Sequence, residues 1–242
     1  MGEDQHARDH AMQIWKISLR PLSAFGTPLV GDTLFGQLCW ALRLRRGETG
    51  LTALLAGYTE GRPFLVVSDA FPAGLLPRPS LPDALLGRQY DPAKRKDDKR
   101  KLWLPNEYSD LPLLDWLDMA TALDDKTRAR TDVLTQNTIN RLTGTTGTGQ
   151  FAPRQVDRTV YPGDSLLDLY CVLDETRLDE AALREALADI GASGYGRDAS
   201  TGLGKFEIAA MARHLWPASA DLQHAITLAP CAPVPEVLRA HE

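Results

Sequence analysis

The sequence predicts an α+β fold in which an antiparallel sheet carries helices on one face. Three observations support this prediction: a half-buried strand pattern near the N-terminus, two amphipathic helical segments, and a glycine-rich loop that leads into a final strand. The chain has 242 residues, of which 43% are apolar and 24% charged, so it can bury a full core as one large domain or two small ones.

The first half of the chain supplies a strand, a helix and a second strand. Residues 12–19 (MQIWKISL) alternate apolar and polar side chains, as a half-buried strand does. Residues 31–46 repeat leucine at every fourth position, which predicts a helix with one buried face and an arginine-rich end, and Asp32 is placed to cap its first turn. Residues 63–72 are a β-branched run that predicts the second strand, and the proline-dense residues 70–82 predict a loop.

An insertion at 84–127 interrupts this pattern. Its basic run, KRKDDKRK at 94–101, could hold a phosphate backbone or form a solvated loop, and the residues leave both interpretations open. The apolar segment at 111–123 (LPLLDWLDMATAL) predicts a helix within the insertion.

A β-hairpin is predicted after the insertion. Residues 133–143 (VLTQNTINRLT) have a strand pattern, and a glycine and threonine tract, GTTGTGQ, follows them. A returning strand then runs through Arg158 to Tyr161 and from Leu166 to Leu173. Two strands around a flexible tip predict a protruding hairpin over 137–160.

The last elements are a helix, a glycine-rich loop and a strand. Residues 178–190 place five apolar side chains on one side of a helix, which should end at Gly191 and Gly194 because glycine adopts the left-handed cap conformation. The glycine-rich loop covers 194–204 and feeds the final strand. The order β, α, β, insertion, hairpin, α, β is that of the ferredoxin-like (RRM-type) fold.

These elements give three expected regions. We expect a flexible leader at 1–11, a folded domain at 12–210 and a short tail at 211–242. Neither end nor interior holds an apolar stretch of the length of a membrane span or a signal peptide, so we expect a cytoplasmic protein that does not contact a membrane.

Charge and cysteine content exclude several classes of protein. The net charge is -5, so any surface for nucleic acid must be local. Cys39, Cys171 and Cys231 are far apart and have no paired histidine, which argues against zinc and disulfides and predicts buried reduced thiols. Asp69 has no partner at ligand spacing, so we expect no metal and no cofactor.

The loop at 194–204 is the best candidate for a phosphate-binding segment. Its glycines allow backbone amides to approach a phosphate, and Arg197, Ser200 and Thr201 add side-chain donors. The glycines follow a helix and precede a strand, which is the reverse of a dinucleotide-binding motif. A tight helix-to-strand connection that merely requires glycine is the alternative.

Four segments, taken in order, resemble motifs of one protein family. They are GDTLFGQLCWAL at 31–42, VSDAFPAGLLPRPSLP at 67–82, TQNTINRLTGTTGTGQFAPRQ at 135–155 and GYGRDASTGLGKFEI at 194–208. The last looks like the glycine-rich signature of the RAMP superfamily, the ferredoxin-like subunits of CRISPR interference complexes. Together they resemble the Cas-five-like group and are most similar to the fourth subunit of type III-A (Csm) complexes. That family usually has a second ferredoxin-like half, whereas about thirty residues follow the final strand here.

The resemblance implies a non-catalytic subunit that caps the 5′ repeat-derived tag of the guide RNA (crRNA). Its partners would be the guide RNA, the large subunit and a backbone subunit, with target nucleic acid as a further option, and its hairpin would act as a thumb. Carried over by position, the RNA-binding candidates are Asn137, Asn140, Arg141, Thr143, Phe151 and Arg154 on or beside the hairpin, and Gly194, Tyr195, Gly196, Arg197, Ser200, Thr201, Gly202, Gly204 and Lys205 in or beside the loop. Phe151 as a core residue and Asn140 as a turn residue are the alternatives.

Two competing functions follow from other classes of protein. Some relatives in this superfamily are metal-independent endoribonucleases that process precursor guide RNA with a histidine, or with a tyrosine and a lysine. No histidine lies between Met12 and Met211, which disfavours this chemistry, although Tyr195 near Lys205 could substitute. The other is a stand-alone RRM-like RNA-binding protein, which the acidic net charge disfavours.

Overall fold

The computed structural model describes residues 12–80, 95–112, 115–125, 127–216 and 226–231. The leader predicted at 1–11, much of the tail predicted at 211–242 and the first residues of the insertion lie outside the described residues.

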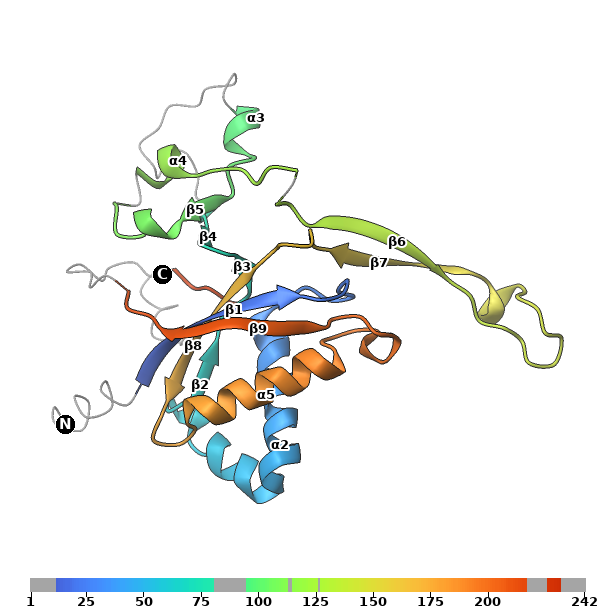
Figure 1. Cartoon of the computed structure of the whole chain (residues 1–242), viewed down its shortest axis with the longest axis horizontal. Helices are drawn as coiled ribbons and strands as arrows, with labels where there is room; N and C mark the ends of the chain where they lie inside the picture. Colours follow the sequence, from blue (N-terminus) through green and yellow to red (C-terminus); the bar gives the residue numbers. More distant parts are fainter. Residues whose placement is uncertain (1–11, 81–94, 113–114, 126, 217–225, 232–242) are drawn as a thin grey trace, which may run out of the picture.

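The main sheet is antiparallel throughout, with the strand order β2-β8-β1-β9 and with β3 also paired to β8. Its strands are β1 (Met12–Pro21), β2 (Leu65–Val67), β3 (Phe71–Pro72), β8 (Leu167–Asp174) and β9 (Phe206–Arg213). Helices α2 (Gly31–Leu55) and α5 (Glu180–Ser193) lie together on one face of this sheet (Figure 1). The predicted antiparallel sheet with helices on one face is confirmed.

The core lies between this sheet and the two helices. Alternate residues of β1 point toward the helices, and Ile17 and Leu19 are fully buried there. The helices contribute Leu34 and Leu38 from α2 and Leu183 from α5, all of them fully buried. Because the period of the strand is two and that of the helix is 3.6, these positions are those that the apolar pattern predicts.

Helix α2 begins where the sequence predicts, but its first turn is capped by a different carboxylate. The Asp69 Oδ1 atom, from the loop after β2, accepts a hydrogen bond from the Gly31 amide at 2.7 Å. Asp32 lies inside the first turn and accepts from Thr33, so its predicted role as the cap is wrong. The helical segment also continues to Leu55, past a break at Gly47, where φ is +74°.

Helix α5 is capped by Asp179, whose side chain accepts from the Ala182 amide at 2.7 Å. The predicted stop at Gly191 is wrong, because the helix continues through Ser193 and ends at Gly194. Gly191 is buried against β9, and a Cβ atom there would lie 2.3 Å from the Phe206 carbonyl oxygen. This glycine therefore allows the helix to approach the strand closely.

A pair of short strands joins the predicted loop at 70–82 to the insertion. Strands β4 (Leu75–Pro77) and β5 (Trp103–Pro105) pair with each other, so the loop prediction for 70–82 is wrong there. In the described part of the insertion, each α-helix is a single turn: α3 (Arg95–Asp98) and α4 (Trp116–Met119). Among the described residues of 111–123, where the sequence predicts a helix, the helix is limited to the single turn α4, because Thr121 pairs through its backbone with Trp103 and keeps the chain extended after α4.

A long hairpin projects from the body of the molecule (Figure 1). Its strands are β6 (Arg130–Gln136) and β7 (Arg154–Val160), joined in an antiparallel register from Arg130 opposite Val160 to Gln136 opposite Arg154. The hairpin was predicted over 137–160, so its first strand lies earlier than expected and the strand predicted at 133–143 ends at Gln136. Residues 137–153 form the tip instead. Short 3-10 turns complete the fold at Tyr58–Glu60, Asn106–Tyr108, Gly149–Phe151 and Ala199–Thr201.

Part of the predicted tail belongs to the folded domain. Strand β9 continues to Arg213, so the expected boundary at residue 210 falls inside a strand. Beyond it, Trp216 and Leu228 pack against Tyr170, and the Leu228 carbonyl accepts from the Asp69 amide at 2.8 Å. These residues cover the face of the sheet opposite the helices. Of the three thiols, Cys171 is buried and Cys231 is exposed, so the prediction of buried thiols is wrong for Cys231.

Candidate nucleic-acid interface

Three segments meet at the base of the hairpin: the loop after β1, strand β7 and the glycine-rich loop. Phe25, in the loop after β1, exchanges two backbone hydrogen bonds of 2.8 Å with Thr159 of β7. The neighbouring Ala24 carbonyl accepts from the Gly204 amide, also at 2.8 Å. The loop after β1 thus holds the hairpin on one side and the glycine-rich loop on the other.

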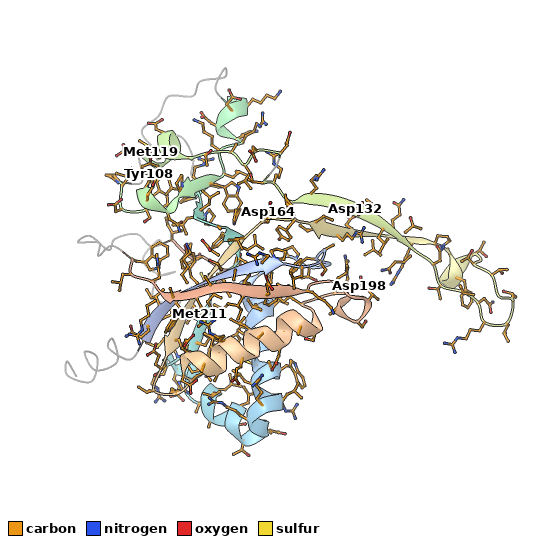
Figure 2. All side chains as sticks on the ribbon, in the orientation of Figure 1. Tyr108, Met119, Asp132, Asp164, Asp198 and Met211 are labelled. Carbon is orange, nitrogen blue, oxygen red and sulfur yellow. The ribbon has the colours of Figure 1, made fainter. Side chains whose placement is uncertain are left out.

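Arg197 connects the glycine-rich loop directly to the hairpin. Its Nη2 atom donates to the Asp157 carbonyl of β7 at 2.6 Å, and its amide donates to the Thr27 Oγ1 atom at 3.0 Å. Its guanidinium also lies 3.5 Å from the Asp198 carboxylate. Figure 2 shows Asp198 on the loop that leads into β9, below the hairpin. Arg197 remains half exposed, so it can still receive a phosphate from solvent.

Most glycines of this loop serve its own packing. A Cβ atom at Gly204 would lie 2.1 Å from the Tyr195 carbonyl oxygen, one at Gly194 would lie 2.5 Å from the Leu203 carbonyl oxygen, and one at Gly196 would meet Thr27 at 2.7 Å. All have positive φ. The tight connection that requires glycine therefore explains these three positions. Gly202 also has positive φ, but open space surrounds it.

Tyr195 belongs to the core and not to the surface. Its side chain is fully buried, and its hydroxyl donates to the Pro28 carbonyl at 2.9 Å and accepts from the Val30 amide at 3.2 Å. Burial raises the pKa of this hydroxyl. The predicted contact between Tyr195 and RNA is wrong for this structure, and the hydroxyl does not face solvent beside Lys205.

The exposed rim of the loop carries the remaining predicted donors. Arg197, Ser200, Thr201 and Lys205 are all exposed. The Thr201 hydroxyl donates to the Asp198 carbonyl at 2.8 Å and so is partly occupied. Within the described residues, the Lys205 ammonium group has no ion pair. The loop therefore presents two cations and a hydroxyl to solvent.

The tip of the hairpin carries a second group of predicted residues. Asn137, Arg141 and Thr143 are exposed. The Asn140 side chain accepts from the Leu142 amide at 2.9 Å, which is the turn role that the sequence left open. Phe151 is half-buried and lies outside both core clusters, so the alternative of a core phenylalanine is not supported.

Arginines line the strands of the hairpin and were only partly predicted. Arg154 donates to Gln136 at 2.8 Å, and Arg158 pairs with Asp132 at 2.6 Å, which lowers the pKa of Asp132. Between Arg130 and Val160 the hairpin has four arginines and two aspartates, although the whole chain has a net charge of -5. The signal that would have found Arg130 and Arg158 is the presence of arginines in the strand segments on both sides of the glycine and threonine tract.

The predicted residues thus form two groups. The glycine-rich loop lies at the base of the hairpin, and the tip extends far from it (Figure 1). Figure 2 places Asp132 on the hairpin between them. A single strand of nucleic acid would have to run along the hairpin to contact both.

The open face of the sheet is not available as a binding platform. RRM modules stack bases on exposed aromatic side chains of their sheet. Here Tyr170, on that face of β8, is only 4% exposed, because the rings of His214 and Trp216 lie 5.3 Å and 5.0 Å from it. Burial raises the pKa of Tyr170 to about 12 and, together with Lys16, lowers the pKa of His214. A base could reach Tyr170 only if the segment after β9 moved away.

The described residues contain no cluster of three or more metal-binding side chains. The same part of the chain has no helix long and apolar enough to cross a membrane.

No family model matches the sequence, and no curated protein matches it. Solved structures do match. A chain of the Csm1-Csm4 cassette in complex with cA4 superposes with a TM-score of 0.54 at 16% identity, covering 86% of this chain and 73% of that one. A chain of the cassette in complex with pppApA gives a TM-score of 0.52 at 19% identity, covering 74% of this chain and 67% of that one. A chain of the Csm3-Csm4 subcomplex of the type III-A CRISPR-Cas interference complex gives a TM-score of 0.50 at 12% identity, covering 83% of this chain and 69% of that one.

The chain has the fold of subunits of Csm complexes. The resemblance to RAMP-type CRISPR subunits, which the sequence motifs predict, is therefore confirmed at the level of the fold.

Proposed function

We propose that this protein is a non-catalytic crRNA-binding subunit of a type III CRISPR effector complex. In this proposal it caps the 5′ repeat-derived tag of the guide RNA, acts in the cytoplasm and bridges a large subunit and a backbone subunit. The strand order and the two β-α-β units support a ferredoxin-like domain, and the hairpin is its thumb.

The projecting hairpin is the observation that carries the proposal. Its base is held by hydrogen bonds from Phe25 and Arg197 to β7, and its tip carries the exposed Arg141 and the half-buried Phe151. Within the described residues, Arg141 has no ion pair, so its guanidinium is free to bind phosphate. Single-stranded RNA is held by phosphate neutralisation and by stacking on aromatic rings, and both groups are present here.

The distribution of charge is consistent with a subunit that binds RNA together with neighbouring subunits. The hairpin and the rim of the glycine-rich loop are basic, whereas the whole chain is acidic. A protein that holds RNA alone needs a large basic surface. A subunit whose neighbours also contact the RNA does not need such a surface.

The partners follow from the solved structures of similar fold. In these structures Csm4 is assembled with Csm1 in one set and with Csm3 in another. We infer that this chain likewise has two protein neighbours, one of each kind.

The test is co-purification of the tagged chain from cells that also carry its neighbouring genes, followed by sequencing of the bound RNA. Guide RNAs with a uniform 5′ tag, recovered in a multi-subunit particle, are the expected result. The variant Arg141→Gln should reduce the RNA recovered, and Arg184→Gln, on helix α5 in an ion pair with Glu180, is the matched control.

A cleavage assay of the isolated chain on repeat RNA separates this proposal from the endoribonuclease alternative. No cleavage is expected. Cleavage that persists in a chelator and in the purified single chain would replace the capping role by precursor processing.

A further inference from the structure

A cavity of about 1020 Å³ lies between the insertion and the base of the hairpin. Its walls come from the region of β3 and β4, from residues 99–103 and 123–129 of the insertion, and from residues 161–167, which connect β7 to β8. Figure 2 shows Asp164 at this junction. Ligand pockets in proteins typically measure about 300 to 1,000 Å³, so the cavity has room for a small organic ligand.

The charged side chains that line the cavity are mostly cationic. They are Lys99, Arg100 and Arg128, against the single carboxylate of Asp164. The Arg128 Nη2 atom donates to the Leu123 carbonyl at 2.9 Å, which holds this guanidinium at the wall. In the described part of the chain, neither Lys99 nor Arg100 has an ion pair. The cavity therefore favours an anionic ligand.

The rest of the lining is largely apolar and includes two aromatic rings. Trp103 is half-buried, with its ring 6.5 Å from that of Phe71, and Tyr161 packs edge-on against Phe25 at 5.6 Å. Both rings are thus held in place by core residues while they line the cavity. Fixed rings and nearby cations suit a ligand that has a flat apolar part and a negative part, as a nucleotide has.

The cavity also continues the surface of the hairpin. Arg128 and Arg130 lie two residues apart on the approach to β6, and Tyr161 follows directly after Val160 at the end of β7. An RNA strand that runs along the hairpin toward its base would arrive at the cavity. On the sheet, Tyr170 is covered by Trp216, whereas the cavity has room for a nucleobase at the base of the hairpin.

We propose that this cavity receives an unpaired nucleotide of single-stranded RNA, with its base against the Trp103 and Tyr161 walls and its phosphate beside Lys99 and Arg100. This inference rests on the proposed function and extends it. It also assigns a role to the basic run of the insertion, for which the sequence left two interpretations open. An acidic peptide is the other occupant that the lining would accept.

The first test is photo-crosslinking with the full-length protein. Oligonucleotides of about 16 nucleotides, the upper site size of single-strand binding modules, would carry 4-thiouridine at one position at a time. Mass spectrometry should find one position crosslinked to peptides that contain Trp103 or Tyr161, and other positions crosslinked to the hairpin tip. Crosslinks confined to the tip and the glycine-rich loop would overturn the cavity proposal while leaving RNA binding intact.

The second test removes charge from the cavity without touching its core. The double variant Lys99→Gln and Arg100→Gln should bind the same oligonucleotides more weakly and lower the slope of log affinity against log salt by about 0.7, the value for one lost phosphate contact with a single strand. The control is Arg46→Gln with Arg184→Gln, which removes two exposed charges on helices α2 and α5, outside the cavity. Equal slopes for the two double variants would contradict the proposal.

The two proposals fail in different ways. If the unaltered chain binds none of the oligonucleotides, alone or in the co-purified particle, the proposed function fails. If it binds them and only the hairpin variants weaken binding, the cavity inference fails alone. Competition by an acidic peptide, lost in the Lys99 and Arg100 variant while RNA binding is kept, would assign the cavity to a protein partner instead.

Discussion

Replacing Tyr195 by phenylalanine separates a structural role of the glycine-rich loop from a role in RNA binding. The substitution keeps the buried ring and removes only the hydroxyl that bonds to the Pro28 carbonyl and the Val30 amide. The Val30 amide also donates to the Pro28 carbonyl at 2.9 Å, so both backbone groups keep a partner. The expected cost is therefore that of one net hydrogen bond, about 1 kcal/mol.

This cost predicts a small thermal shift and no functional change. For a domain of this size, about 1 kcal/mol lowers Tm by roughly 2 to 4 °C. Tyr195→Ala should cost more, about 3 to 5 kcal/mol, because it leaves a cavity in the core. Tm is measured by circular dichroism and RNA affinity by fluorescence anisotropy. A Tyr195→Phe protein with unchanged Tm and a tenfold loss of RNA affinity would refute the assignment of Tyr195 to the core.

Three further predictions concern buried groups and loop glycines. Asp168→Ala should lower the free energy of unfolding, measured by urea denaturation, by about 3 to 5 kcal/mol. This fully buried carboxylate pairs with Lys16 and accepts hydrogen bonds from the Ser18 hydroxyl and the Gly74 amide. Because burial lowers the pKa of His214, the unfolded chain binds a proton more readily than the native one, so stability should fall as the pH drops below about 6.5. Gly202→Ala should leave a folded protein that is about 1 to 2 kcal/mol less stable, whereas Gly204→Ala should not give soluble folded protein, because its Cβ would meet backbone 2.1 Å away.

Each of these predictions has its own control. An Asp168→Ala loss below about 1 kcal/mol would mean that the buried pair is not important for stability. The pH dependence should be smaller in His214→Gln, and an equal dependence would assign it to other groups. A Gly204→Ala protein as stable as Gly202→Ala would contradict the close approach between Gly204 and Tyr195.

The sequence predicts the elements of the core well, because their apolar periods are local. The positions of Ile17 and Leu34 follow from periods of two and 3.6. Contacts between distant segments are not visible in the same way. The Asp69 carboxylate caps a helix 38 residues before it, and no spacing rule distinguishes it from Asp32, which lies next to the helix start.

The candidate site was predicted only in part for the same reason. A glycine-rich loop looks alike whether its glycines approach a ligand or its own backbone, and Gly204 does the latter against Tyr195. The helix predicted over 111–123 is one turn long in the described residues, because the pairing of Thr121 with Trp103 overrides helix propensity after Met119. The arginines of the hairpin were visible, but their placement on one projecting element depended on a register that the sequence did not define.

The strand order also determines when this protein can fold during its synthesis. Among the described strands, β1 pairs with β8 and β9, so the first strand made has no partner until the ribosome has released β8, which ends at Asp174. The hairpin of β6 and β7, in contrast, needs only its own residues and can close earlier. A growing chain therefore carries an unpaired apolar strand through most of its translation, and a chaperone that binds extended apolar segments would find it there.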